Sequence, residues 1–267
     1  MSSTGFTHKN VWVANGSNEV IQSIFLAFGQ GKALGFTPSY SMHALIGRVS
    51  KTEWIDGFRN SDFSLNIDDA IDQIQTNKPT LTFVTTPNNP TGGAVAIADI
   101  VKIAEAVKAV GGLLVIDEAY AEFSEQVSAV SLISDSPHVI VIRTMSKAFA
   151  FAGARVGYLV ADPKVIDAML IVRLPYHLSS ITQAVAEVAL EFKEELLAGV
   201  HTLIEARNKM VTALTALGLT TIDSDANFIL FTGFSQDTKQ LWSDLLKKGV
   251  LIRDVGVSGH LRVTIGN

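Results

Sequence analysis

Four stretches of the chain repeat one pattern, in which a short apolar run ends in a polar or glycine-rich turn and a helical pattern follows. The apolar runs end at Ala14, Thr86, Ile116 and Ile142. Strands that alternate with helices in this way form a mostly parallel sheet through right-handed crossovers. Ligands of such sheets bind beyond the carboxyl ends of the strands. The pattern therefore predicts an α/β domain whose ligand site lies where the four turns meet.

The end of the chain follows a different pattern. A helical region at about 180–217 has an apolar stripe and mixed charges, which suggests a connector between domains. Beyond it, a helical stretch at 237–248 lies among apolar runs at 227–231, 249–254 and 261–266, as in a small α+β lobe. We expect a large domain at residues 1–190 and a small C-terminal domain at 191–267.

Composition narrows the class of protein. The chain has 267 residues, a formal net charge of −5 and no cysteine, which excludes a disulfide framework and thiolate metal sites. Without blocks of Lys or Arg, there is no electrostatic reason to expect nucleic acid or an anionic membrane as a partner. The first ten residues lack the apolar core of a signal peptide. We expect a cytoplasmic protein that no membrane segment anchors.

Lys147 stands out among the candidate residues. It follows the apolar run 139–142, and the five residues after it carry no charge. A lone lysine is usually solvated, but apolar neighbours favour the neutral amine, which has a lowered pKa and attacks carbonyl groups. Hydroxyl and cationic neighbours that could hold a phosphate are Thr144, Ser146 and Arg155. The stretch suggests a lysine joined to pyridoxal phosphate.

The turn that follows the first apolar run allows two interpretations. It contains Gly16, Ser17 and Asn18 and opens a helical pattern. An ordinary helix cap is the commoner explanation. The alternative is an anion site, because free backbone N–H groups at the start of a helix bind phosphate.

Two loops that follow apolar runs carry further candidates. Tyr40 either packs on the core or stacks on a planar ligand. Asn89 lies in a loop with two prolines and two glycines within residues 87–93, which fixes the backbone without a helix. Its amide can donate to a ligand oxygen.

Asp117 ends a buried apolar run and therefore needs a cationic or donor partner. Arg143 or Arg155 would make it structural, whereas a protonated pyridine nitrogen would make it part of a cofactor site. Three residues later, Tyr120 could place a phenol near the same ligand.

Arg253 and Arg262 lie in otherwise apolar runs near the end of the chain. They either form surface salt bridges or bind an anionic group of a substrate. For His177, a structural hydrogen bond is a commoner role than catalysis.

Six motifs together resemble those of the fold-type I, pyridoxal-phosphate-dependent aminotransferases of class I and II. In this sequence they are 15–19, 38–40, 88–92, 117–120, 146–149 with Arg155, and 261–266. The resemblance covers nearly the whole chain and is strongest to the branch that acts on histidinol phosphate. It implies a three-layer large domain and a smaller α+β domain.

The resemblance also implies a role for each candidate. Lys147 would form the Schiff base with the cofactor and move the substrate proton, and Asp117 would hold the ring nitrogen. Tyr40 would stack on the ring, while Asn89 and Tyr120 would bind its phenolic oxygen. The cofactor phosphate would be held by Gly16, Ser17, Thr144, Ser146 and Arg155, with Asn18 nearby. Arg253 and Arg262 would receive the phosphate of histidinol phosphate or the carboxylate of glutamate.

The implied reaction belongs to histidine biosynthesis. L-glutamate leaves its amine on the cofactor, and imidazole acetol phosphate takes it up to become L-histidinol phosphate. A homodimer is expected. Members of the family are longer, so we also expect that an amino-terminal segment, with an arm over the substrate and a tyrosine for the neighbouring subunit, and the final helix are missing here.

Two other functions compete. An aromatic amino acid aminotransferase, for example one acting on phenylalanine, would also place a flat ring in the pocket. A module that binds the cofactor or a partner without turnover is the alternative of another class. A dinucleotide-binding domain is disfavoured, because no G-x-G-x-x-G follows the first apolar run.

Overall fold

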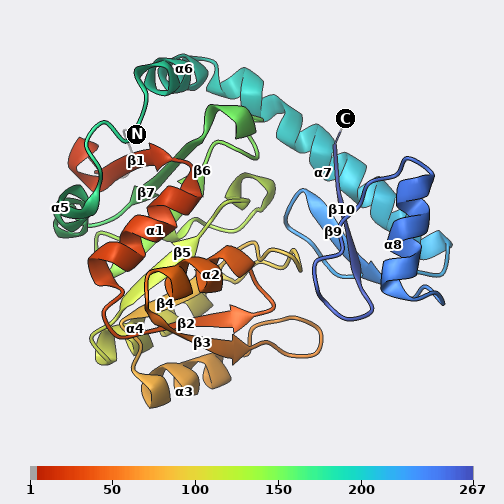
Figure 1. Ribbon diagram of the computed structural model, residues 1–267, viewed down its shortest axis with the longest axis horizontal. Coiled ribbons are helices and arrows are strands. Elements are labelled where there is room, and N and C mark those ends of the chain that lie inside the picture. The colour runs from red at the N-terminus through yellow and green to blue at the C-terminus, as the bar shows by residue number, and fades with distance from the viewer. Residues whose placement is uncertain (1–4, 267) are drawn as a thin grey trace.

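The computed structural model describes residues 5–266 and shows a large and a small lobe joined by helices (Figure 1). A seven-stranded sheet, in the order β1-β7-β6-β5-β4-β2-β3, forms the centre of the large lobe. All its strands run in the same direction except β7, which is antiparallel to both of its neighbours. The strands are β1 Val11–Asn15, β2 Lys32–Thr37, β3 Glu53–Phe58, β4 Leu81–Thr85, β5 Leu113–Asp117, β6 Val139–Thr144 and β7 Val156–Val160. The predicted mostly parallel α/β sheet is confirmed.

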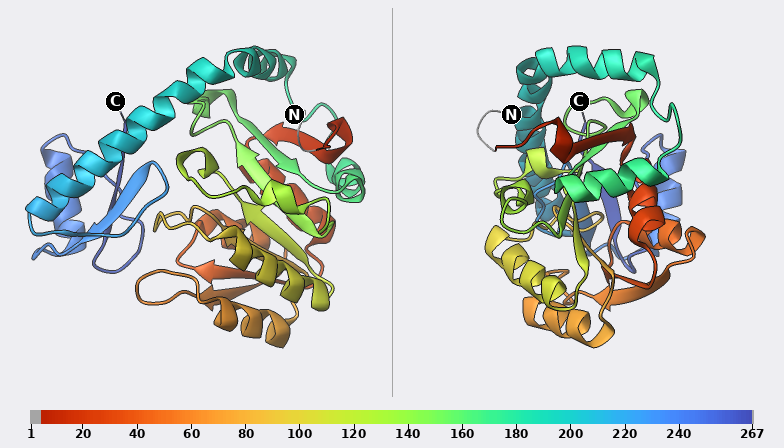
Figure 2. Two further views of the ribbon diagram at one scale, coloured as in Figure 1. Left: turned by 180° about the vertical axis from the view of Figure 1, so that it is seen from behind. Right: turned by 90° about the vertical axis from the view of Figure 1, so that its left-hand side faces the viewer.

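Helices cover both faces of this sheet and make the three layers (Figure 2). Alternate side chains of a strand point to opposite faces, so in β6 Val141 joins one hydrophobic cluster, and Ile140 and Ile142 join the other. The first cluster includes residues of α3 and α4, the second residues of α1 and α5. The helices of the large lobe are α1 Ser17–Phe28, α2 Ser41–Val49, α3 Ile67–Asn77, α4 Ile97–Ala109 and α5 Pro163–Val172. Short 3₁₀ turns are η1 His8–Asn10, η2 Ala121–Phe123, η3 Ala129–Leu132 and η4 Ala152–Ala154.

The small lobe has its own sheet and core. Its strands, in the order β10-β9-β8, are β8 Thr220–Thr221, β9 Phe228–Thr232 and β10 Leu261–Thr264, and α8 Thr238–Lys247 packs beside them. Ile229, Phe231 and Leu261 are buried against partly buried residues of α8. The long helix α7, Lys193–Ala216, leads from the large lobe to this sheet after α6, Ser180–Glu191 (Figure 1). The boundary that we propose between the domains, after residue 190, lies near the end of α6.

The helical region expected at about 180–217 is confirmed, with one interruption at Phe192, whose φ of −99° separates α6 from α7. One expectation about the end of the chain was wrong. The apolar run 249–254 is not a strand, and Arg253 forms only an isolated bridge with Arg262. The Ile252 carbonyl accepts a hydrogen bond from the Trp242 side chain instead. Leu251 is 72% exposed whereas Ile252 is buried, so only part of the apolar surface of this run is covered.

Candidate active site

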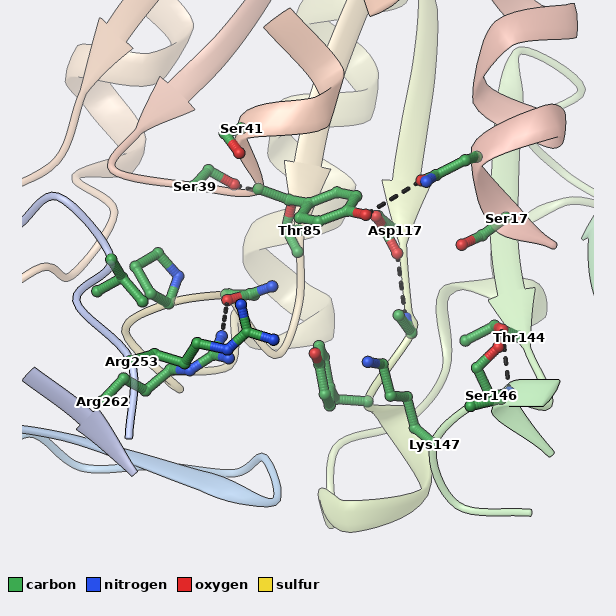
Figure 3. A pocket seen from close by; sticks show the side chains of 18 of the residues that line it. Ser17, Ser39, Ser41, Thr85, Asp117, Thr144, Ser146, Lys147, Arg253 and Arg262 are labelled. Carbon is green, nitrogen blue, oxygen red and sulfur yellow. Dashed lines mark hydrogen bonds between the residues drawn. The ribbon is translucent and has the colours of Figure 1, made fainter. Parts of the chain in front are cut away.

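A cavity of about 520 Å³ lies at the carboxyl ends of β4, β5 and β6, where the large lobe faces the small one (Figure 3). Every candidate residue from the sequence lines it except Gly16, which lies against Arg155. The candidates on its wall are Ser17, Asn18, Tyr40, Asn89, Asp117, Tyr120, Thr144, Ser146, Lys147, Arg155, Arg253 and Arg262. The large sheet and the small lobe together therefore bring six separate motifs to one place.

Lys147 extends from the loop after β6 into this cavity (Figure 3). Its ammonium nitrogen lies 5.4 Å from the centre of the Tyr120 ring. Burial is the main cause that lowers the pKa of Lys147 below its usual value, and the positive charge of Arg262 is the second. The side chain is still reached by water inside the open cavity. A larger fraction of this lysine is thus neutral than of an ordinary surface lysine, as the sequence predicted.

Asp117 has two protein partners. Its Oδ2 lies 3.0 Å from Nε2 of His43, and its Oδ1 accepts a hydrogen bond of 3.1 Å from the Ala119 N–H. His43 is itself buried, with its ring packed between Tyr40 and Phe83. The carboxylate is therefore fixed at the centre of the sheet.

Neither of the two arginines suggested from the sequence is a partner of Asp117. Arg143 instead forms ion pairs of 2.9 Å with Glu118 and with Glu122. Arg155 forms no ion pair with any residue between 5 and 266. Because a second acceptor site on Oδ2 can still bind a donor, Asp117 is suited to hold a protonated ring nitrogen.

Tyr40 is the N-cap residue of α2 and stands at one wall of the cavity. Its hydroxyl donates a hydrogen bond of 3.1 Å to Asn18, and burial is the main reason why its pKa is raised. The ring is therefore held by both a polar contact at its tip and packing against His43. A planar ligand above Asp117 would lie beside it.

Asn89 is held by the small lobe. The guanidinium of Arg262 donates a hydrogen bond of 2.5 Å to the Asn89 side-chain carbonyl, which leaves the amide NH₂ of Asn89 as a donor. Arg262 lies 4.7 Å from the centre of the Phe228 ring, and Tyr120 packs edge-on against the same ring. Burial raises the pKa of Tyr120 to about 12, so this phenol stays protonated and can donate.

Arg253 and Arg262 lie side by side on the wall formed by the small lobe (Figure 3). Their backbones exchange two hydrogen bonds of 2.9 and 2.8 Å. Neither forms a salt bridge with a residue in the part of the chain that the structure describes. The surface salt bridges considered for them are thus not observed, and two cations face the cavity.

The opposite end of the cavity is rich in hydrogen-bond donors. Glu19 and Val20 already direct their N–H groups to the Gly16 carbonyl, but those of Ser17 and Asn18 have no acceptor within residues 5–266. Arg155 has a left-handed backbone with φ of 57° and a guanidinium whose one hydrogen bond, 3.3 Å long, goes to a backbone carbonyl. Donors at a helix start beside an unpaired cation suit a phosphate.

Gly16 suits this end because of its backbone, whose φ of 86° is one that glycine adopts readily. A Cβ at this position would lie 2.9 Å from Cζ of Arg155, so the flexible end of that side chain would have to shift. Close by, the Thr144 hydroxyl lies 2.9 Å from the Ser146 hydroxyl and accepts the Ser146 N–H.

These residues fit pyridoxal phosphate. A carboxylate stands ready for a ring nitrogen, an amide and a phenol for a ring oxygen, an amine for an aldehyde and a donor cluster for a phosphate. Within residues 5–266 no group of three or more His, Cys, Asp or Glu side chains is arranged to hold a metal ion. None of the helices in that part of the chain combines the length and apolar composition that a membrane crossing needs.

Sequence reasoning missed several residues of the site. His43 is the most important, and its position three residues after Tyr40 at the start of a helix was the available signal. Ser39 also lines the cavity, and its hydroxyl donates a 2.8 Å hydrogen bond to Asn88. Ser41 and Thr85 complete this wall. As expected, His177 makes a structural contact, 2.9 Å from the Val13 carbonyl.

Known proteins are similar to this chain along nearly its whole length. The family described as aminotransferase class I and II matches residues 2–267. The histidinol-phosphate aminotransferase of Mycobacterium sp. (strain JLS) is 52% identical over 97% of this chain, and that of Nocardia farcinica is 54% identical over 96%. This chain spans 68% and 66% of the length of those two proteins.

A solved structure supports the fold. Histidinol-phosphate aminotransferase from Sinorhizobium meliloti, in complex with pyridoxal-5'-phosphate, superposes with a TM-score of 0.88 over 99% of this chain and 74% of its own. At 23% identity, this likeness shows the fold alone.

Proposed function

The chain belongs to the class I and II aminotransferases, and from this we propose that it transfers the amino group of L-glutamate to imidazole acetol phosphate with pyridoxal phosphate as cofactor. The products are 2-oxoglutarate and L-histidinol phosphate, a step of histidine biosynthesis. The names of relatives at 52–54% identity support this substrate. The observation that carries the proposal is the cavity that joins Lys147, Asp117 and Arg155.

Each part of the cofactor would meet a matching group. Asp117 would hold the ring nitrogen, with Asn89 and Tyr120 at the phenolic oxygen and Tyr40 against the ring. The phosphate would be bound by residues that line the donor-rich end of the cavity or lie beside it, namely Gly16, Ser17, Asn18, Thr144, Ser146 and Arg155. The chemistry that the cofactor supplies is an electron sink for the substrate carbon that loses its proton.

Lys147 has two tasks in this proposal. As a neutral amine it would hold the cofactor, and once the amine of the substrate had displaced it, the freed amine would take the proton from the substrate Cα atom. Both tasks require the unprotonated form, which burial and Arg262 favour by lowering its pKa. The Tyr120 ring lies nearby, with its centre 5.4 Å from the Lys147 nitrogen.

The substrates would be oriented by the small lobe. Arg253 and Arg262 face the cavity with no carboxylate partner in the described part of the chain. They would bind the phosphate of histidinol phosphate or the carboxylate of glutamate, one after the other, because the two substrates use the same site in turn. Guanidinium groups suit both anions, since they form paired hydrogen bonds with either.

We also propose that the protein works as a homodimer in the cytoplasm, without nucleic-acid or membrane partners. Its net charge of −5 gives no basis for attraction to either polyanion. Exposed apolar side chains on α5, α6 and the loop between them, among them Ile171, Leu174 and Ile181, support a protein partner. Sedimentation at several protein concentrations measures the oligomeric state, and a monomer at all of them would refute the dimer.

The proposed reaction is tested in two half-reactions. Protein loaded with pyridoxal phosphate is expected to lose the visible absorbance of the bound cofactor when glutamate is added and to regain it with imidazole acetol phosphate. Lys147→Ala should fail in both steps. A protein that binds the cofactor but does not respond to any amino donor would instead be a binding module.

Substrate preference is tested separately. We expect a higher kcat/KM for histidinol phosphate than for phenylalanine. A preference for phenylalanine by about tenfold, or about 1.4 kcal/mol in the transition state, would favour an aromatic amino acid aminotransferase.

A further inference from the structure

Gly157, on strand β7, packs against the turn that forms the donor-rich end of the cavity, where Ser17 and Arg155 lie. In the sheet it pairs with Ala14 of β1 on one side and with Thr144 of β6 on the other. Those two strands lead into the Gly16 turn and into the loop of Ser146. Gly157 therefore lies between the two strands that lead into the phosphate end.

The Gly16–Ser17 peptide lies directly on Gly157. A Cβ at position 157 would lie 2.8 Å from Cα of Ser17 and closer still to the Ser17 nitrogen and the Gly16 carbonyl carbon. Real Cβ atoms essentially never come within 3.0 Å of such atoms, and ordinary contact begins at 3.4 Å. The neighbours are backbone, so a flexible side chain cannot move aside to relieve the overlap.

The neighbouring residues of β7 serve the same end of the cavity. Arg155 precedes the strand and carries the unpaired cation. The Val156 carbonyl accepts the Met145 N–H at 3.0 Å and lies 3.2 Å from the Thr144 hydroxyl, so it fixes the loop that bears Ser146. Three successive residues thus shape this end: Arg155 supplies the cation, Val156 fixes the loop of Ser146, and Gly157 packs against the start of α1.

We propose that Gly157 is a positioning residue for the cofactor phosphate, because its missing side chain lets the Gly16–Ser17 turn lie close enough to Arg155 and Ser146 for all three to bind one phosphate. The inference rests on the proposed function. It concerns only the phosphate of the cofactor, so it can fail while the aminotransferase reaction stands.

The size of the displacement gives the expected effect. To restore ordinary contact with Ser17 Cα, the turn must move by at least 0.6 Å, the difference between 3.4 and 2.8 Å. Hydrogen bonds from N–H to oxygen span only about 2.7–3.2 Å. The shift therefore removes at least one hydrogen bond to a charged oxygen, which corresponds to about a tenfold loss of affinity.

The test compares two ligands that differ only in the phosphate. Cofactor-free wild type and Gly157→Ala are titrated with pyridoxal phosphate and with pyridoxal. We expect Gly157→Ala to weaken pyridoxal phosphate by about tenfold or more and to leave pyridoxal unchanged. Gly153→Ala is the matched control, because a Cβ there meets no atom within 4 Å. An equal loss for both ligands, or no loss for either, would overturn the proposal.

A second pair of variants tests the premise if Gly157→Ala does not fold. Ser17→Pro removes the N–H that Gly157 brings to the cavity, and proline is well tolerated at the first position of a helix. Ser17→Ala removes only the hydroxyl. We expect pyridoxal phosphate to bind about tenfold more weakly to Ser17→Pro than to Ser17→Ala, with equal pyridoxal affinity. Equal affinities of these two variants for pyridoxal phosphate would contradict the proposal.

Wild-type binding separates this inference from the proposed function. If the wild type binds neither ligand, the cofactor assignment fails. If it binds pyridoxal phosphate and pyridoxal equally well, the phosphate end is not a phosphate site and the role of Gly157 fails with it.

Discussion

Both oxygens of Asp117, at the end of the cavity formed by β5, have protein partners. At the end formed by α1 and Arg155, the N–H groups of Ser17 and Asn18 have no acceptor within residues 5–266, and Arg155 donates only one hydrogen bond, of 3.3 Å, to the Ala152 carbonyl. The first end is buried, with Asp117 3% and His43 2% exposed. The second is open, and Arg155 is exposed. The same ligand would therefore meet two differently prepared surfaces.

The difference follows from what each surface must do before a ligand arrives. A buried carboxylate without partners costs several kcal/mol, so Asp117 needs His43 and Ala119 for the fold itself. An exposed cation and free N–H groups at a helix start are satisfied by water. We call the Asp117 end the ring end and the donor-rich end, with Ser17 and Arg155, the phosphate end. We infer that the ring end supports both stability and catalysis, while the phosphate end supports ligand affinity alone.

The largest expected effect is at the ring end. Asp117→Ala leaves the buried His43 ring without its partner, which should lower the free energy of unfolding by about 1–3 kcal/mol. It should also lower kcat by about 10²–10⁴-fold, because the ring nitrogen loses its acceptor. Chemical denaturation and steady-state rates measure the two losses.

The matched control for this variant is Asp167→Asn, on the exposed face of α5. It should change neither quantity appreciably. An unfolding free energy of Asp117→Ala equal to that of wild type would show that Asp117 does not stabilise the fold. That result would contradict the difference in stability that we infer between the two ends.

A smaller and different effect is expected at the phosphate end. Arg155→Ala should weaken pyridoxal phosphate by about 10–100-fold, the range for one hydrogen bond to a charged group. Its cofactor-free unfolding free energy should stay within about 0.5 kcal/mol of wild type, since the residue is exposed and unpaired. Titration calorimetry and cofactor-free denaturation together decide this. If Arg155→Ala lost as much unfolding free energy as Asp117→Ala, both ends would contribute to stability, and the inferred difference between them would be wrong.

The third prediction concerns Lys147, which lies between the ends. Its lowered pKa means that it reacts with acetic anhydride at lower pH than an ordinary lysine. Arg262→Ala removes a positive charge that opposes protonation, so the pKa of Lys147 rises and its labelling curve moves to higher pH. Mass spectrometry of the Lys147 peptide follows the curve without any cofactor.

Arg48→Ala serves as the control for this shift, because Arg48 is exposed on α2 and does not line the cavity. A shift to lower pH in Arg262→Ala would show that the charge of Arg262 does not act on Lys147 as we infer.

The smallest effect is expected from Ser39→Ala. The Ser39 hydroxyl donates to Asn88 at 2.8 Å and lies 3.0 Å from that of Thr85. Removing it should cost about 0.5–1.5 kcal/mol of unfolding free energy, with little change in cofactor affinity. A larger loss of affinity than of stability would show that this wall contacts the ligand directly.

Much of this architecture could be predicted from the sequence, because it depends on local patterns. Each apolar run that ends in a polar turn marks the carboxyl end of a strand, and parallel strands place those ends on one edge. For this reason Ser17, Asn89, Asp117 and Lys147 were expected together and line one cavity.

What could not be predicted depends on contacts between distant residues. His43 meets Asp117 across 74 positions, and Arg262 meets Asn89 across 173. No local pattern distinguishes a histidine that will meet a carboxylate from one that packs elsewhere. The partners of Arg143 were missed for the same reason, since no local pattern shows that it pairs with Glu118 and Glu122 and not with Asp117. At 249–254 the apolar run predicted a strand that the contact with Trp242 replaces.

The order of the sheet has a consequence for motion. β5, which carries Asp117, is the central strand with three strands on each side, whereas β1, which leads into Gly16, lies at an edge. Opening β1 breaks one strand pairing, but exposing β5 requires the sheet to come apart. Amide hydrogens near Asp117 should therefore exchange with solvent on the timescale of global unfolding, and those near Ser17 much sooner. A bound phosphate would slow exchange only near Ser17. The cofactor would therefore stabilise the edge of the sheet, while the central strand is stable without it.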